Sequence, residues 1–460
     1  MLLQPNQSFT LNGFQCDNYM FQVPLDYSHQ LEGTIPLFVR VVSLENPNTA
    51  TTRNTCPPKV VCYLQGGPGM ESPRPDSTHF LRPLLDYFDV IVLLEQRGTG
   101  LSFPIHWKVL EAYSSHVKEQ AKFLSCFRAD SIVRDAEYCR KSLYGDSTWS
   151  ILGQSFGGFC AVTYLSLFPH SLHSCYITAG LPPIFPGFQG ISVYEALFQR
   201  LIQQNEKYYC HFPQDIPLVR SIVQYLDRSS GIKLSSGSIL TPRGLQTLGH
   251  RTLGFTGGFG SLHCLLEKAF TQDFQGNRIL SEHFLATVDQ ILSSWETHPL
   301  YAVLHESIYW NGSDKEENCT SIWAAEQVFR SLSCFDASYC LQTQRPIYFT
   351  GEMIFPFMFE QFASLRPYQK VVDQLAKERN WSMLYHKEQL QNNPIPTAAA
   401  IFYDDIYVDY HKSIETARQI AHCNIWVTNE YLHGALREDT KRVIGMLEKL
   451  LLHRSSCLEL

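Results

Sequence analysis

The chain has 460 residues, 44% of them hydrophobic and 18% charged, a composition typical of a globular protein with a large core rather than of a disordered chain. The formal net charge is -7 and no run of Lys or Arg is present, which argues against nucleic acid or an anionic membrane as a partner. No uninterrupted apolar run of about 18 residues occurs, so no membrane span is expected.

The N-terminus and the cysteines bear on the compartment. Residues 1–20 lack a basic segment followed by a long apolar stretch, so a signal peptide is not expected. The 14 cysteines are scattered without a CxxC pair, and several, such as Cys62 and Cys175, lie in apolar contexts where a thiol behaves as a small buried hydrophobe. We therefore expect reduced thiols and a cytoplasmic protein.

The first part of the chain alternates short apolar runs with helical patterns. Helical spacing covers residues 117–143 and the segment from Ser155 to Pro169. Continuous apolar runs that end near glycine favour strands buried on both faces, as in a parallel sheet, and the alternation predicts an α/β layer architecture. The expected strands are 37–42, 60–64, 88–94, 149–152 and 175–178.

The alternation fades after about residue 183 and returns near residue 391. The intervening region is rich in aromatic residues and in long helical patterns, such as 193–205 and 282–296. The simplest interpretation is one α/β core, made of residues 1–182 and 391–460, interrupted by a mainly helical cap at 183–390. In the last part we expect strands at 396–402 and 424–428 and helices at 411–421 and 438–452.

A candidate nucleophile lies between an expected strand and an expected helix. Residues 153–157 read Gly-Gln-Ser-Phe-Gly, which matches G-x-S-x-G with Ser155 at its centre. A tight strand-to-helix turn forces the serine into a strained conformation and projects its hydroxyl above the sheet, and the flanking glycines relieve clashes. The N–H of Phe156 would then open the helix, where it can donate to an oxyanion. This pattern predicts the α/β-hydrolase fold.

A second glycine-rich segment follows the strand expected at 60–64. It reads Gln-Gly-Gly-Pro-Gly over residues 65–69. Glycines let the backbone approach a ligand closely, and in this position Gly66 and Gly67 can present N–H groups to an oxyanion.

A serine nucleophile needs a base and a group that orients the base. In this fold the acid and then the histidine follow the serine along the chain, each after one of the last two strands. His433 comes soon after the expected strand 424–428, and we take it as the base. Asp405 and Asp404 both follow the strand 396–402. We prefer Asp405 over Asp404 as the acid, with Asp409 as a third choice, and expect the one not chosen of the pair to cap the turn or the following helix.

At these motifs the chain resembles the proline iminopeptidases, or prolyl aminopeptidases. The resemblance runs from about Phe21 to the C-terminus through QGGPG, EQRGTG, GQSFGG, a late Asp and a late His. Two positions depart from the family pattern, since Gln65 stands where the family usually has histidine and Glu95 where it usually has aspartate. The resemblance implies a cytosolic serine peptidase with a helical cap, which removes an N-terminal residue, preferably proline.

An enzyme of this kind must hold a free ammonium group, and a buried ammonium needs a carboxylate partner. The family places glutamates in its cap for this purpose. By resemblance, Glu306 is the first choice for this role and Glu352 the second. Tyr301, Tyr309 and Trp310 are candidates for the wall of a pocket for a proline ring, or for packing residues of the cap.

Three functions compete on the sequence. The first is an aminopeptidase acting on short peptides or aminoacyl amides with a free N-terminus. The second is an esterase or amidase that acts on small apolar substrates with the same triad. The third, a binding protein on an inactive hydrolase fold, is disfavoured because Ser155, Asp405 and His433 form a complete set. No metal or other cofactor is expected, because the His and Cys residues show no ligand spacing.

Overall fold

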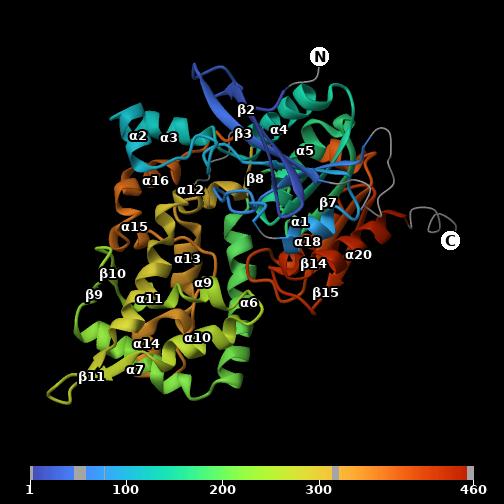
Figure 1. Ribbon diagram of the computed structural model, residues 1–460. Helices are drawn as coiled ribbons and strands as arrows, with labels where there is room; N and C mark the ends of the chain where they lie inside the picture. The colour runs from blue at the N-terminus through green and yellow to red at the C-terminus, as the bar shows by residue number, and fades with distance from the viewer. Residues whose placement is uncertain (1–3, 46–57, 77, 313–320, 453–460) are drawn as a thin grey trace.

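In the computed structural model, which describes residues 4–45, 58–76, 78–312 and 321–452, a nine-stranded sheet forms the upper part of the molecule in the view of Figure 1. The strand order is β1-β2-β3-β5-β4-β6-β7-β14-β15. The strands are β1 (Gln7–Leu11), β2 (Phe14–Pro24), β3 (Thr34–Leu44), β4 (Val60–Leu64), β5 (Val90–Leu94), β6 (Trp149–Gln154), β7 (Leu172–Thr178), β14 (Thr397–Phe402) and β15 (Cys423–Thr428).

The sheet changes character along its width. Strands β1, β2, β3 and β5 pair in antiparallel fashion, whereas all pairs from β5 to β15 are parallel. Every residue of β4, β6 and β14 is buried, which agrees with their uninterrupted apolar sequences and with a sheet covered on both faces. The parallel strands all end at one edge of the sheet, where ligands bind in open α/β sheets.

Helices cover both faces of this sheet. One apolar cluster joins the sheet to helices α1 and α20, and the larger cluster includes α4 and α5 on the opposite face. Helices α2 and α3 lie beside the first half of the core, and α18 and α19 belong to its last part. The bounds are α1 (Thr78–Leu84), α2 (Trp107–Tyr113), α3 (Val117–Ser125), α4 (Ala129–Tyr144), α5 (Phe156–Leu167), η2 (Pro169–Ser171), α18 (Tyr410–Ala417), α19 (Ala435–Glu438) and α20 (Thr440–Leu452).

The chain between β7 and β14 is mainly helical and carries three two-stranded ribbons. The long helix α6 stands in Figure 1 between the rest of this region and the β14–β15 end of the sheet. The elements are β8 (Gly187–Phe188), α6 (Gly190–His211), α7 (Asp215–Arg228), β9 (Ile232–Lys233), β10 (Ile239–Leu240), α8 (Pro242–Gln246), α9 (Gly249–Thr252), α10 (Gly258–Glu267), β11 (Phe270–Gln272), β12 (Arg278–Leu280), α11 (Glu282–Ser293), η3 (Ser294–Glu296), α12 (Pro299–Leu304), η4 (Glu306–Tyr309), β13 (Trp310–Asn311), α13 (Ala324–Ser331), η5 (Ser333–Phe335), α14 (Ala337–Gln342), α15 (Met358–Gln361), η6 (Arg366–Tyr368), α16 (Gln369–Leu375) and α17 (Lys387–Gln391).

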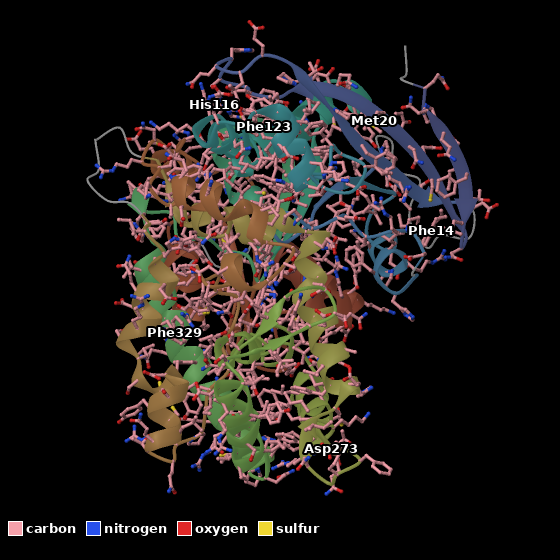
Figure 2. The ribbon with its side chains drawn as sticks, turned by 90° about the vertical axis from the view of Figure 1, so that its left-hand side faces the viewer. Phe14, Met20, His116, Phe123, Asp273 and Phe329 are labelled. Atoms are coloured by element: carbon pink, nitrogen blue, oxygen red, sulfur yellow. The ribbon has the colours of Figure 1, made fainter. Side chains whose placement is uncertain are left out.

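The two parts of the molecule lie at opposite ends of the view in Figure 2. Phe14 and Met20 mark the antiparallel end of the sheet, and Asp273, in the turn between β11 and β12, marks the far end of the helical region. Among the described residues, no helix is both long enough and apolar enough to cross a membrane.

The predicted α/β fold is confirmed, with a mostly parallel sheet and helices inserted between β7 and β14. The expected helix at 117–143 is two helices, α3 and α4, and the expected strands all lie in the sheet. Strands β1 and β2 had not been expected. The domain boundaries at 182/183 and 390/391 stay a prediction.

Candidate active site

Ser155 lies at a sharp turn between β6 and α5. Its backbone has φ 56° and ψ -126°, a strained conformation for a residue with a side chain. A Cβ added at Gly157 would lie 1.9 Å from the carbonyl oxygen of Leu64, and one added at Gly153 would lie 2.2 Å from the carbonyl oxygen of Gly157. Glycine is therefore required at both flanking positions, and the turn matches the nucleophile elbow expected from G-x-S-x-G.

The glycine-rich segment after β4 passes directly beside this serine. A Cβ added at Gly66 would lie 3.0 Å from Cβ and 3.6 Å from Oγ of Ser155. Gly67 has φ 131°, a conformation that side chains other than glycine rarely adopt. Phe156 is the first residue of α5, so its N–H is one of the helix N–H groups without an intrahelical partner. The structure thus brings both Gly66 and Phe156 next to Ser155.

Asp405 and His433 form a hydrogen-bonded pair at the same edge of the sheet. Oδ2 of Asp405 lies 2.7 Å from Nδ1 of His433, and both side chains are buried. Oδ1 of Asp405 accepts hydrogen bonds from the N–H groups of Tyr407 at 2.7 Å and Val408 at 3.1 Å. Because both carboxylate oxygens are engaged, Asp405 is held rigidly against the imidazole, which leaves Nε2 of His433 available to another group.

The neighbouring aspartates have other partners. Oδ1 of Asp404 lies 2.7 Å from Nζ of Lys207 in α6. Oδ1 of Asp409 accepts a hydrogen bond from the N–H of Lys412 at 2.8 Å and caps α18. Asp404 was expected to cap the turn or the following helix, but it forms an ion pair with Lys207 of α6, a helix that is far away in the sequence.

The surroundings of His433 favour its protonated form. Burial opposes protonation, but the charge of Asp405, its hydrogen bond and the charge of Glu352 together raise the pKa of His433 above its ordinary value. The rings of Tyr407 and Phe255 lie against the imidazole, with centroids 4.5 Å and 6.3 Å away. A base held in this way is well placed to take and return a proton.

Glu352 lies in the irregular segment between α14 and α15 and is buried. The hydroxyl of Tyr309 donates a hydrogen bond of 2.6 Å to its Oε1, and Nε2 of His305 is 3.6 Å from the same oxygen. Among the residues that the structure describes, no lysine or arginine forms an ion pair with Glu352. This carboxylate lies within electrostatic reach of His433 and has spare capacity for a cation.

Glu306, the first choice from the sequence for the amine-binding carboxylate, lines a cavity that Glu352 does not line. The cavity has a volume of about 20 Å³, and burial raises the pKa of Glu306, although hydrogen bonds from Ser321 and from the N–H of Ala325 favour the charged form. Trp310 lines the same cavity. One observation connects the two carboxylates, because burial and the charges of both Glu306 and Glu352 raise the pKa of Tyr194.

The two tyrosines named from the sequence lie on the Glu352 side. The ring of Tyr301 stacks on His305 at 5.0 Å, and the ring of Tyr309 is 5.5 Å from that of Tyr194. Tyr301 also faces His250, whose ring in turn faces Tyr407 at 5.7 Å. Aromatic rings thus extend from the surroundings of His433 to the surroundings of Glu352.

The two departures from the family motifs have defined partners, which the sequence did not reveal. Oε1 of Gln65 accepts hydrogen bonds from Arg437 at 2.8 Å and from the hydroxyl of Tyr63 at 2.9 Å. Arg437 follows His433 by four residues, so this contact ties the histidine segment to the glycine-rich segment. Buried Glu95 accepts two hydrogen bonds of 2.7 Å from Arg74. In the sequence, the departure of Gln65 from the family motif was the signal that could have prompted a search for its partner.

No group of three or more His, Cys, Asp or Glu side chains within the described part of the chain has a geometry that could hold a metal ion.

Comparisons with known proteins show which family the chain resembles over most of its length. A family profile described as alpha/beta hydrolase fold matches residues 59–238. The chain is 40% identical over 447 residues to a proline iminopeptidase of Aeromonas sobria, covering 96% of this chain and 98% of that protein. It is 34% identical over 441 residues to a proline iminopeptidase of Aspergillus aculeatus, covering 93% and 92%. A crystal structure of a Mycobacterium smegmatis proline iminopeptidase superimposes with a TM-score of 0.43 at 13% identity, over 94% of this chain and 99% of that one.

Proposed function

Since the chain belongs to the proline iminopeptidase family, we propose that it is a serine aminopeptidase that releases N-terminal proline from short peptides through Ser155, His433 and Asp405. The observation that carries the proposal is buried Glu352, a carboxylate without a lysine or arginine partner among the described residues and within electrostatic reach of His433. A free N-terminal amine is the cation that this position suits.

The proposed catalytic steps are those that a serine, a histidine and an aspartate carry out together. Oγ of Ser155 attacks the carbonyl carbon of the first residue while Nε2 of His433 takes the hydroxyl proton. Asp405 holds the imidazole in the required tautomer and stabilises its protonated form. His433 then gives the proton to the leaving amine, and the remainder of the peptide departs. A water molecule, deprotonated by His433, then attacks the acyl carbon, the bond to Oγ of Ser155 breaks to release the first residue, and His433 returns the proton to Oγ.

The negative charge that develops on the carbonyl oxygen needs donors beside Ser155. We assign this role to the N–H groups of Phe156 and of Gly66 or Gly67, because both segments lie next to the nucleophile. The N–H group at the start of α5 also benefits from the helix dipole.

The carboxylate order expected from the sequence is reversed in this proposal. We assign Glu352 as the main partner of the substrate amine, because its charge acts on His433 and it accepts a hydrogen bond from Tyr309. Glu306 is assigned a secondary role through Tyr194, which lies within electrostatic reach of both carboxylates. The cytoplasmic location expected from the sequence stays a prediction.

The test is a panel of aminoacyl chromogenic amides, each with an N-acetylated control. We expect the prolyl amide to be cleaved fastest and the N-acetylated compounds to be cleaved poorly, because acetylation removes the positive charge. Rapid cleavage of N-acetylated substrates would show an amidase or esterase that uses the same triad, and the aminopeptidase proposal would be wrong.

A further inference from the structure

Three polar residues of α6 lie on one face of that helix and contact the turn that carries Asp405. They are Arg200, Gln204 and Lys207, at spacings of four and three residues, which place side chains on one helix face. Their common target is the pair Tyr403–Asp404, which directly precedes Asp405 after β14. We call these three residues the α6 clamp.

Each member of the α6 clamp makes its own contact. Nζ of Lys207 lies 2.7 Å from Oδ1 of Asp404, and Nη1 of Arg200 lies 3.6 Å from the same oxygen. The guanidinium of Arg200 also lies over the ring of Tyr403, 4.6 Å from its centroid, and Gln204 donates to the carbonyl oxygen of Asp404 at 3.4 Å. The side chain, ring and backbone of the Tyr403–Asp404 pair are therefore all engaged by one helix of the inserted region.

The same turn is held from a second direction. The hydroxyl of Tyr407 donates a hydrogen bond to the carbonyl oxygen of His250 in α9. A Cβ added at Gly254, just after α9, would lie 2.2 Å from Cε2 of Tyr407 and 2.7 Å from Cγ1 of Ile406, so this segment packs closely against the turn. The acid-bearing turn thus lies between α6 and the α9 segment, both of which belong to the chain inserted between β7 and β14.

We propose that the α6 clamp positions Asp405, so that the triad is aligned only while α6 is packed against the turn after β14. Asp404 and Asp405 are consecutive residues, and a shift of the first displaces the second. The Asp405–His433 bond of 2.7 Å is short and directional, so a small displacement weakens it. The clamp residues are positioning residues, because they act on the reaction through Asp405 and do not touch the substrate.

This inference rests on the proposed roles of Ser155, Asp405 and His433. It is tested with a small neutral p-nitrophenyl ester, whose hydrolysis needs the triad but no amine-binding carboxylate. An enzyme that hydrolyses the ester but not prolyl amides contradicts the aminopeptidase proposal and still tests the clamp. Ester hydrolysis that survives Ser155→Ala contradicts the proposed triad itself.

The main variant is Lys207→Met, because this side chain is 47% exposed and its removal leaves no buried gap. We expect kcat for the ester to fall on the order of 10-fold with little change in KM, as for a misplaced catalytic group. Lys207→Arg, which keeps the charge, should restore most of the rate. Glu206→Gln, which removes a charge from the exposed side of the same helix, is the matched control and should behave like the wild type.

The pH dependence of kcat/KM distinguishes a displaced Asp405 from a direct electrostatic effect of the lost Lys207 charge. The titratable groups around His433 are Asp405 and Tyr407 from the turn after β14, His250 from α9, and Glu352. If Asp405 moves away, its charge supports the imidazolium less, and the acidic limb of kcat/KM moves to lower pH. If instead the loss of the Lys207 charge acted directly on His433, the pKa of His433 would rise and the acidic limb would move to higher pH.

The expected result is therefore a lower kcat and an acidic limb at lower pH in the Lys207→Met variant, with a similar effect for Asp404→Asn. The fraction of active enzyme is counted by fluorophosphonate titration, so partial unfolding is not mistaken for a slower rate. An acidic limb in Lys207→Met that stays in place or moves to higher pH, whatever happens to kcat, overturns the proposal.

Discussion

The catalytic edge of the sheet and the carboxylate-bearing part of the inserted region place their side chains by different means. At the sheet edge, Ser155, Asp405 and His433 follow the carboxyl ends of β6, β14 and β15. Backbone features hold them there, such as the positive φ of Ser155 and the hydrogen bonds of Asp405 to two N–H groups. Their approximate positions follow from the sheet topology, and in the proposal above the α6 clamp sets the final position of Asp405.

In the inserted region the two glutamates lie where helices are interrupted. Glu306 begins η4 directly after α12 ends, and Glu352 lies in an irregular segment. Their positions depend on aromatic packing and on a few contacts, such as the bond from Tyr309 to Glu352. In the proposed function, the sheet edge supplies chemistry common to many substrates, whereas the inserted region supplies selection of the free amine.

The largest effect is expected at the sheet edge. Ser155→Ala and His433→Ala should each lower kcat by about 10⁴ or more for esters and amides alike, because an unassisted serine is a weak nucleophile. Labelling by a fluorophosphonate probe should disappear in Ser155→Ala. His173→Ala, which alters an exposed histidine of β7, is the control and should retain full activity. Wild-type turnover by either catalytic variant would contradict the triad.

The next largest effect should differ between substrates with a free amine and neutral substrates. Glu352→Gln should reduce kcat/KM for prolyl amides by about 10² or more, because a desolvated ammonium loses its charged partner. Neutral esters should be affected much less, and the two substrates are compared in the same preparation. Equal losses on prolyl amides and neutral esters would show that Glu352 does not bind the substrate amine. Such a result would also contradict the proposal that the inserted region selects the free amine.

Glu306→Gln tests the order of the two carboxylates. We expect a smaller loss on prolyl amides than for Glu352→Gln, because Glu306 lines a separate small cavity and burial raises its pKa, which favours the neutral form. The ratio of the two kcat/KM losses is the measurement. A larger loss for Glu306→Gln would restore the order expected from the sequence.

A moderate effect is expected where the histidine segment meets the glycine-rich segment. Arg437→Met removes the hydrogen bond to Gln65 and should lower kcat about 10-fold for esters and amides equally, because the oxyanion donors are less well held. Arg442→Met, which removes an exposed ion pair on α20, is the matched control. A loss confined to amides would mean that Arg437 serves substrate selection instead.

The smallest effect concerns pH. His433 must be neutral to act as a base, and its pKa is raised, so kcat/KM should fall as the pH drops through a value above about 6.5, the ordinary value for histidine. In Glu352→Gln one of the charges that raise this pKa is absent, so the acidic limb of ester hydrolysis should move to lower pH. A limb that stays in place would show that Glu352 and His433 are not coupled.

Much of the catalytic edge could be predicted because its signals are local. The apolar runs of β4, β6 and β14 and the glycines around Ser155 are each written within short segments, and the acid and histidine are then found from their places just after the last two strands. Backbone conformation depends on such neighbours, so short patterns suffice to predict strands and turns. The helix expected at 117–143 was less accurate, since the break between α3 and α4 carries no glycine or proline signal.

From the sequence alone, the α/β core, the strained turn at the serine and the approximate positions of an acid and a histidine could be predicted. The contact of Asp405 with His433, the contact of Asp404 with Lys207 and the effect of the Glu352 charge on His433 became visible only in the folded molecule. The reason is physical. Asp404 and Lys207 are separated by 197 positions along the chain, and a contact over such a distance depends on how helices pack against the sheet, which no local pattern encodes.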